Sequence, residues 1–162
     1  LSAFNKKRNI YLSGMFGNTH FPYELDGYRS EPHLSQMVTE GIRLLNNRKG
    51  FFIMAEGARI DHACHSGIID RAIHEIIEFE NAVIEAYNWA KDRDDVLILI
   101  TADHETGGLK IVENNGIGEY PTITWSTGGH TGADVNLYAW GKDSELFIDI
   151  QDNTGFYSRL TK

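Results

Sequence analysis

Two apolar runs constrain the fold of this 162-residue chain more than any other feature. Residues 51–55 and 96–101 lack the polar alternation of a half-exposed strand, so each is predicted to be a short strand covered on both faces. A long helical pattern lies between them, from about residue 63 to residue 91. This strand–helix–strand order predicts a crossover connection between two parallel strands.

Acidic and histidine residues follow both runs directly. Glu56, Asp61 and His65 come after the first run, and Asp103 and His104 come after the second. Ligand sites of open α/β sheets form beyond the carboxyl ends of the strands, so these side chains are expected at one edge of the sheet. The sequence therefore predicts a metal site at this edge, built from carboxylates and imidazoles.

The spacing of the candidate ligands supports this interpretation. Asp61 and His65 are four residues apart, which places them on one face of a helix that starts near Asp61. His130 lies in the glycine-rich loop 126–132, which has little structural need for an imidazole.

Cys64 is read as a small packed residue. As the only cysteine, it excludes an intrachain disulfide and a multi-cysteine zinc site, so any zinc must be held by histidine and carboxylate.

The remaining pattern predicts smaller elements. We expect a strand at 9–14, a loop at 16–29, a helix from about 30 to 45, a hairpin formed by 109–112 and 122–125, a strand at 136–141, a short helix at 145–150 and a last helix after Asn153. Together they predict one domain over residues 1–162. Its fold class is α/β, with a mostly parallel sheet covered by helices on both faces.

The charge of the chain limits its partners. With 15 basic and 23 acidic residues, the formal net charge is −8, which argues against nucleic acid because such a partner needs a basic face. No apolar run approaches the roughly 20 residues of a membrane span, and no signal peptide opens the chain. The chain does not begin with Met, and we expect it to be a piece of a longer protein.

These motifs resemble the alkaline phosphatase family. Residues 50–62 are similar, almost residue for residue, to the strand and metal loop of that family, and 22–26 and 31–34 also resemble family segments. Three separated motifs agree in order and spacing: Glu56, Asp61 and His65; Asp103 and His104; and His130, Thr131 and Gly132. The resemblance runs from about Ile10 to the C-terminus, and it implies an alkaline-phosphatase-like fold that is incomplete here.

The resemblance also implies a role for each candidate residue. The metal ligands that it implies are Asp61, His65 and His130 for one zinc, Asp103 and His104 for a second zinc, and Glu56 for magnesium. His62 matches a position that touches phosphate. The implied activity is hydrolysis of phosphate monoesters. A serine would take the phosphoryl group in line, and the phosphoserine would then be hydrolysed, with two metals stabilising the attacking and leaving oxygens.

The serine nucleophile of the family has no counterpart in this sequence. A Thr-Asp-Ser-Ala type segment is absent, and Ser144, in the only Asp-Ser pair, is read as a helix N-cap. The early aspartate and the phosphate-binding arginine of the family are missing as well, since Arg59 lies inside the metal loop. The resemblance therefore implies the C-terminal part of an alkaline phosphatase, inactive alone, with the nucleophile in an N-terminal half outside this chain.

The family also implies partners and a location. We expect a phosphate monoester substrate, the missing N-terminal half of the same protein, a homodimer, and a periplasmic or secreted protein. Without the neighbouring strands of the missing half, the sheet would expose an unpaired edge and apolar surface. We therefore expect the isolated chain to self-associate.

Two alternatives stay open. One is a zinc-binding domain without catalysis, since Asp61, His65 and His130 form a complete three-ligand set within the chain. The other is a phosphodiesterase, a sulfatase-like enzyme or a phosphoglycerate mutase of similar architecture, because these also carry Asp-His after a strand.

Overall fold

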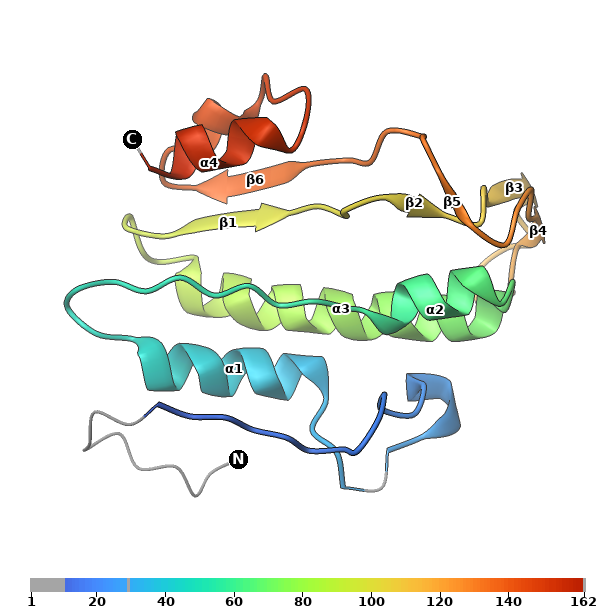
Figure 1. The fold of residues 1–162 in the computed structure, drawn as a ribbon, viewed down its shortest axis with the longest axis horizontal. Coiled ribbons are helices and arrows are strands. Elements are labelled where there is room, and N and C mark those ends of the chain that lie inside the picture. Colours follow the sequence, from blue (N-terminus) through green and yellow to red (C-terminus); the bar gives the residue numbers. More distant parts are fainter. Residues whose placement is uncertain (1–10, 29, 162) are drawn as a thin grey trace.

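The computed structural model describes residues 11–28 and 30–161, and it is organised around one long helix (Figure 1). This helix, α3 (Ile69–Ala90), lies between α1 (Leu34–Leu45) on one side and the strands β1 (Leu97–Ile100) and β6 (Tyr138–Gly141) on the other. The chain is an α/β protein in which helices and antiparallel strand pairs pack side by side. In the ranges described, no helix is both long enough and apolar enough to cross a bilayer.

The core between α1 and α3 explains why the predicted helix forms where it does. The buried residues of this core are Val38, Ile42 and Ala82, and Phe51 and Ile53 pack against them from the connecting segment. The apolar positions recur along one face of α1, so burial of that face stabilises the helix against α3. The helix predicted at 30–45 is confirmed, with its start at residue 34.

The single long helix predicted from 63 to 91 is wrong, because the chain forms two helices there. Helix α2 (Arg59–His65) ends before α3 begins, and Gly67 between them has a φ of 65°. The amide of Gly67 donates to the carbonyl of Cys64, and that of Ile68 donates to the carbonyl of Ala63. These two bonds close a helix C-terminus around a glycine in the left-handed region. Gly67 therefore ends α2 and redirects the chain into α3.

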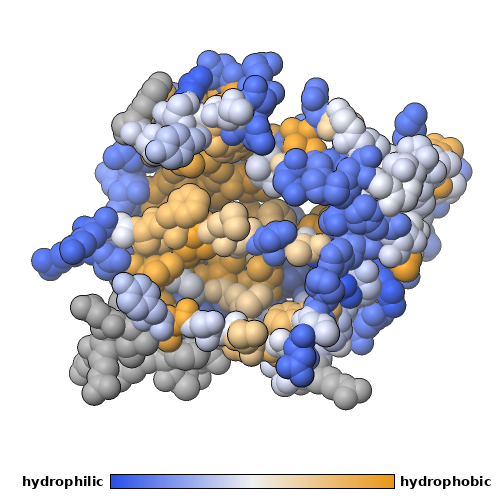
Figure 2. All heavy atoms as spheres, in the orientation of Figure 1, coloured by the Kyte–Doolittle hydropathy of each residue, from blue (hydrophilic) through white to orange (hydrophobic). Residues whose placement is uncertain are grey.

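Residues 51–55 are extended but form no strand, so the first predicted strand is not found. Among the described residues no segment pairs with 51–55. Phe51 and Ile53 face the helical core, whereas Phe52 and Met54 are 74% and 80% exposed. The expected cover on both faces is therefore present on one face only. Figure 2 shows a broad apolar area on the side where Figure 1 places this segment.

The predicted parallel sheet is also not found. Strand β1 pairs antiparallel with β6, with Ile98 opposite Trp140, so the neighbour of the second apolar run is a strand from much later in the chain. Within the described part of the chain, the ladders are three separate antiparallel pairs. The parallel sheet is therefore not confirmed. Residues 51–55, which were expected to supply the parallel neighbour, pack against the core between α1 and α3 and join no ladder among the described residues.

Two further strand pairs build the end of the molecule that carries the histidines. Strand β3 (Lys110–Glu113) pairs with β4 (Thr122–Thr124), which confirms the predicted hairpin. Strand β2 (Glu105–Thr106) pairs with β5 (His130–Thr131), which places Thr106 opposite His130. This short pair is important for the site, because it brings the glycine-rich loop back to the residues that follow β1.

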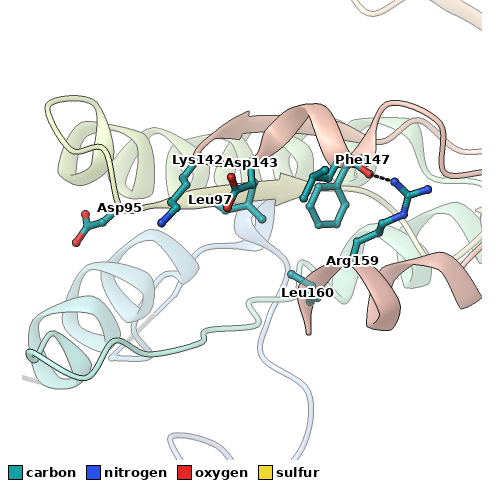
Figure 3. A pocket seen from close by; sticks show the side chains of 8 residues that line it. Asp95, Leu97, Lys142, Asp143, Phe147, Arg159 and Leu160 are labelled. Atoms are coloured by element: carbon teal, nitrogen blue, oxygen red, sulfur yellow. Dashed lines mark hydrogen bonds between the residues drawn. The ribbon is translucent and has the colours of Figure 1, made fainter. Parts of the chain in front are cut away.

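The C-terminal segment packs beside β6. The 3-10 helix η2 (Ser144–Phe147) is shorter than the helix predicted at 145–150, and its cap position is held by Asp143 and not by Ser144. Helix α4 (Thr154–Leu160) follows, and the Nη1 of Arg159 donates to the carbonyl of Leu146 at 2.7 Å. Figure 3 shows Arg159 and Phe147 in a pocket of about 160 Å³ that is remote from the histidines.

Residues 11–28, the described part of the N-terminal region, contain one short 3-10 turn and no strand. Of the strand predicted at 9–14, residues 9 and 10 lie outside the described residues, and 11–14 form no strand. The predicted loop 16–29 contains the 3-10 turn η1 (Glu24–Asp26), and residue 29 is likewise outside the described ranges.

Candidate metal centre

Three of the predicted ligands meet at one point. Asp61 and His65 come from α2, and His130 comes from β5. The Nε2 of His65 lies 3.3 Å from the Oδ1 of Asp61, the Nε2 of His130 lies 3.4 Å from the same oxygen, and the two Nε2 atoms are 3.0 Å apart. One carboxylate oxygen and two imidazole nitrogens that all lie within 4.8 Å of one another are a suitable donor set for a divalent metal ion.

Local structure positions each of these ligands. The i,i+4 spacing on α2 brings Asp61 and His65 onto one face, as predicted. The β2–β5 pair then carries His130 to that face from 65 residues further along the chain. The predicted loop histidine is thus next to the helix ligands because of a two-residue strand pair, which no local pattern reveals.

The tautomer of His65 suits metal binding. Its Nδ1 lies 2.6 Å from the carbonyl oxygen of Gly128, which can only accept a hydrogen bond. The Nδ1 therefore carries a proton, and the Nε2 is the ring nitrogen that faces Asp61 and His130. Proteins commonly fix metal-binding histidines through a backbone carbonyl in this way.

Asp61 lies in an environment that favours its charged form. Burial alone raises the pKa of this carboxyl, but the Thr106 hydroxyl and the neighbouring His65, His130 and His104 outweigh that effect and hold the pKa below its ordinary value. The Thr106 hydroxyl donates to the Oδ1 of Asp61 at 2.6 Å. An ionised carboxylate that is already oriented is what a metal ligand at this position needs.

The second predicted pair lies beside the first three ligands. The ring of His104 stacks on that of His130, with 3.5 Å between ring centroids and 22° between the planes. Its Nε2 lies 3.1 Å from the Oδ2 of Asp103, whose side chain is 87% exposed. Asp103 and His104 thus face each other next to the Asp61 cluster, and their role as ligands of a second metal stays a prediction.

Glu56 and His62 do not belong to this group of three ligands. Glu56 lines a cavity of about 180 Å³ together with Arg59 and Glu75, and none of Asp61, His65 and His130 lines that cavity. The Nδ1 of His62 accepts a hydrogen bond from the Nη1 of Arg59 at 3.1 Å, and its ring contacts that of His20 edge-on. Since His62 follows Asp61 directly on a helix, it lies on a different face. The predicted magnesium and phosphate roles of Glu56 and His62 stay predictions.

Sequence reasoning missed two residues that support the site. Thr106, only 8% exposed, contacts both Asp61 and His104 through its hydroxyl. Glu105 accepts hydrogen bonds from the Thr131 hydroxyl and from the amide of Gly108, and the first of these does most to lower the pKa of Glu105. These contacts tie β2 to β5 at the position of His130. Knowledge of the β2–β5 pairing would have identified both residues, but no local sequence pattern predicts that pairing.

A second group of potential ligands serves the structure. The carboxylate of Glu24 accepts from the Nδ1 of His33, and Glu78 accepts from the amide of Ser35 and from the side chain of Asn81. Glu24, His33 and Glu78 could hold an ion by distance alone. Their side chains already have hydrogen-bond partners in the protein, and the bond from Ser35 to Glu78 joins the start of α1 to α3. We therefore interpret this group as a structural contact between helices.

Cys64 behaves as the sequence analysis predicted. It packs against the buried cluster of Tyr23, Ala63 and Ala72, and burial raises the pKa of its thiol. A thiol of this kind is a small apolar side chain at neutral pH.

The fold and the clustered ligands define a class, that of α/β proteins with a histidine–carboxylate centre suited to divalent metals. The chain belongs to the alkaline phosphatase family, because the family model described as "Alkaline phosphatase" matches residues 1–122. His130 lies beyond that match. The predicted resemblance is therefore confirmed.

Comparison with individual proteins gives the same family. "Alkaline phosphatase 3" of Bacillus subtilis is 27% identical and aligns with 97% of this chain and 49% of its own length. The tissue-nonspecific isozyme of Gallus gallus is 42% identical over 64% of this chain and 20% of its own length. The chain thus spans about half, or less, of the length of these curated relatives.

Solved structures share the fold. The alkaline phosphatase of the Antarctic bacterium TAB5 is 33% identical, with a TM-score of 0.75 over 86% of this chain and 42% of that chain. A mutant of the TAB5 enzyme, solved with Mg bound in its M3 site, is similar at a TM-score of 0.76. A cold-active alkaline phosphatase from a Shewanella species reaches 0.79 over 91% of this chain at 24% identity, which shows the fold alone.

Proposed function

We propose that this chain carries the histidine-rich part of a zinc-dependent alkaline phosphatase centre that hydrolyses phosphate monoesters. The observation that carries the proposal is the convergence of Asp61, His65 and His130 within 4.8 Å, in a chain of the alkaline phosphatase family. These residues would hold one zinc. Asp103 and His104 would hold a second, and Glu56 would hold magnesium. When bound, such metals stabilise negative charge on the attacking and leaving oxygens of a phosphoryl transfer.

The donor set fits zinc. Imidazole nitrogen and carboxylate oxygen are zinc ligands, and three protein ligands leave a fourth position open for water or phosphate. The Gly128 carbonyl fixes the His65 ring, and the Thr106 hydroxyl orients Asp61, so two of the three donors are set before a metal binds. Prior orientation of this kind strengthens metal binding because less conformational entropy is lost.

The nucleophile would come from residues outside the printed sequence. The resemblance implies a serine in a Thr-Asp-Ser-Ala type segment, and this chain contains no such segment. We propose that this serine belongs to an N-terminal half of the same protein, which would pack on the apolar face near Phe52 and Met54. The active protein would be an exported homodimer. A relative from Bombyx mori is named "Membrane-bound alkaline phosphatase", so the relatives of this chain include a membrane-bound form.

Two measurements on the purified chain test the proposal. Zinc content after dialysis at neutral pH should be at least one ion per chain, and hydrolysis of p-nitrophenyl phosphate should stay at the level of buffer with zinc. If the chain turned the ester over at the rate of a full-length relative, the nucleophile would be within the chain and this part of the proposal would be wrong.

A second candidate function is zinc binding without catalysis. The three ligands Asp61, His65 and His130 are complete within the chain, which favours this reading. Adding a separately expressed upstream half distinguishes the two functions. Phosphatase activity that appears only in the mixture supports the enzyme, and zinc binding with no activity in the mixture supports the binding domain.

A further inference from the structure

The hydroxyl of Thr106 lies between the two predicted metal sites. It is 2.6 Å from the Oδ1 of Asp61, a predicted ligand of the first metal, and 3.1 Å from the Nδ1 of His104, a predicted ligand of the second. Thr106 is 8% exposed, and its strand β2 pairs with the strand that carries His130. One buried side chain thus contacts both ligand sets without being a metal ligand itself.

The proton count of this contact places a proton on one ring nitrogen of His104. A hydroxyl has one proton, and an ionised carboxylate can only accept a hydrogen bond, so that proton points to Asp61. The same oxygen can then only accept from His104, which means that the Nδ1 of His104 carries a proton. The other ring nitrogen, Nε2, faces Asp103 at 3.1 Å. The Nε2 is therefore the atom that His104 offers to a metal shared with Asp103.

We propose that Thr106 is a positioning residue that couples the two metal sites through this hydrogen-bonded chain from His104 to Thr106 to Asp61. It orients the carboxylate of one site and accepts the Nδ1 hydrogen bond of the histidine of the other. The inference rests on the proposed function for the identity of the metals. The Nδ1 proton that it assigns to His104 can be tested in the metal-free chain alone.

The first test is nitrogen-15 NMR of the histidine rings in the metal-free chain. We expect the Nδ1 of His104 to carry a proton in the original chain and in Thr106→Ser, which keeps the hydroxyl. In Thr106→Val, which replaces the hydroxyl with a methyl group, the Nδ1 loses its acceptor. The tautomer with its proton on the Nε2, which faces Asp103, should then become populated. A structural role alone would lower stability in Thr106→Val without this change. An unchanged His104 tautomer in Thr106→Val would overturn the proposal.

The second test is zinc affinity, measured by competition with a chromophoric chelator. Supporting partners of metal ligands typically contribute 10–100-fold, so Thr106→Val should bind zinc about 10–100-fold more weakly than the original chain. Thr106→Ser should remain close to the original. Equal affinity in Thr106→Val and Thr106→Ser would contradict the coupling. Thr106→Ala provides a second hydroxyl-free variant if circular dichroism shows that the valine variant does not fold.

The two tests separate this inference from the proposed function. If the original chain binds no zinc while Thr106→Val still changes the His104 tautomer, the metal centre is wrong and the positioning contact is supported. If the chain binds zinc and neither the tautomer nor the affinity changes in Thr106→Val, the metal centre is supported and the role of Thr106 is overturned.

Discussion

Two histidines of the metal centre, His65 and His104, each have the Nδ1 of the ring hydrogen-bonded to another part of the protein. His65 donates to the carbonyl of Gly128, and His104 contacts the hydroxyl of Thr106. At this scale the sequence was informative where spacing was local, since Asp61 and His65 are one helical turn apart. It was uninformative for Thr106, because that contact depends on how β2 pairs with β5.

Removal of one ligand should abolish tight zinc binding. We predict that His65→Ala lowers zinc affinity by at least about 100-fold, since it removes a donor and not only a supporting contact. The matched control is His74→Ala on α3, whose ring bonds to the carbonyl of Asp70 away from the cluster. Competition with a chelator measures both variants. An affinity for His65→Ala equal to that of His74→Ala would exclude His65 as a ligand.

Elements with a clear local pattern were predicted well. The apolar face of α1 and the alternating residues of the β3–β4 hairpin were predicted close to their observed bounds. The errors concern pairing and helix ends. Residues 51–55 have the composition of a buried strand, but a strand also needs a neighbour, and among the described residues none adjoins them. Gly67 ends α2, because a glycine can take a left-handed conformation that other residues avoid.

A substitution at Gly67 tests that explanation for the break between α2 and α3. Gly67→Ala should lower the free energy of unfolding by about 1–2 kcal/mol, because a φ of 65° is unfavourable for any residue with a Cβ. A Cβ there would be 3.6 Å from the Trp125 ring, an ordinary contact, so the effect comes from the backbone. Urea unfolding measures it. Gly132→Ala, in open space, is the control and should change stability by less than about 0.5 kcal/mol.

The contact between α3 and the start of α1 should depend on pH. Burial raises the pKa of Glu78, but the amide and hydroxyl of Ser35 and the side chain of Asn81 outweigh it and lower that pKa. A carboxyl with a lowered pKa stabilises the fold above its unfolded pKa, about 4.3, and this contribution is lost as the pH falls through the folded value.

We therefore predict that Glu78→Gln lowers stability at pH 7 by about 0.5 kcal/mol, since it removes a charge next to a helix N-terminus but keeps an acceptor. The difference should shrink below about pH 4. Denaturant unfolding of the metal-free chain at both pH values measures it, with the exposed Glu80→Gln as control. A destabilisation of Glu78→Gln that is the same at pH 7 and pH 3 would show that the charge is not the cause.

The molecule as a whole exposes apolar surface that a stable protein normally covers. Phe52 and Met54 are largely exposed. Figure 1 places their segment, 51–55, on the side where Figure 2 shows a broad apolar area. The family and the α/β class could be predicted from the sequence, because the motifs are local. The pairing of the strands could not be predicted from the sequence, because it depends on contacts between segments that are far apart in the chain.

This exposed face should make the isolated chain self-associate. Light scattering should show dimers or larger species at micromolar concentration, and Phe52→Asp with Met54→Asp should shift the chain toward monomer because charges there oppose burial. The control is Ile117→Asp in the β3–β4 turn, which changes a fully exposed apolar residue outside the 51–55 segment. A monodisperse monomer for the original chain across micromolar concentrations would contradict the prediction.

The central claim is that Asp61, His65 and His130 bind zinc, and the direct test is X-ray absorption at the zinc edge of the chain loaded with one equivalent at neutral pH. The account predicts nitrogen and oxygen ligands at about 2.0–2.1 Å, with the outer-shell scattering of two imidazoles and no sulfur. A sulfur ligand near 2.3 Å would indicate Cys64. Either that result, or a chain that retains no zinc to measure, would contradict the claim.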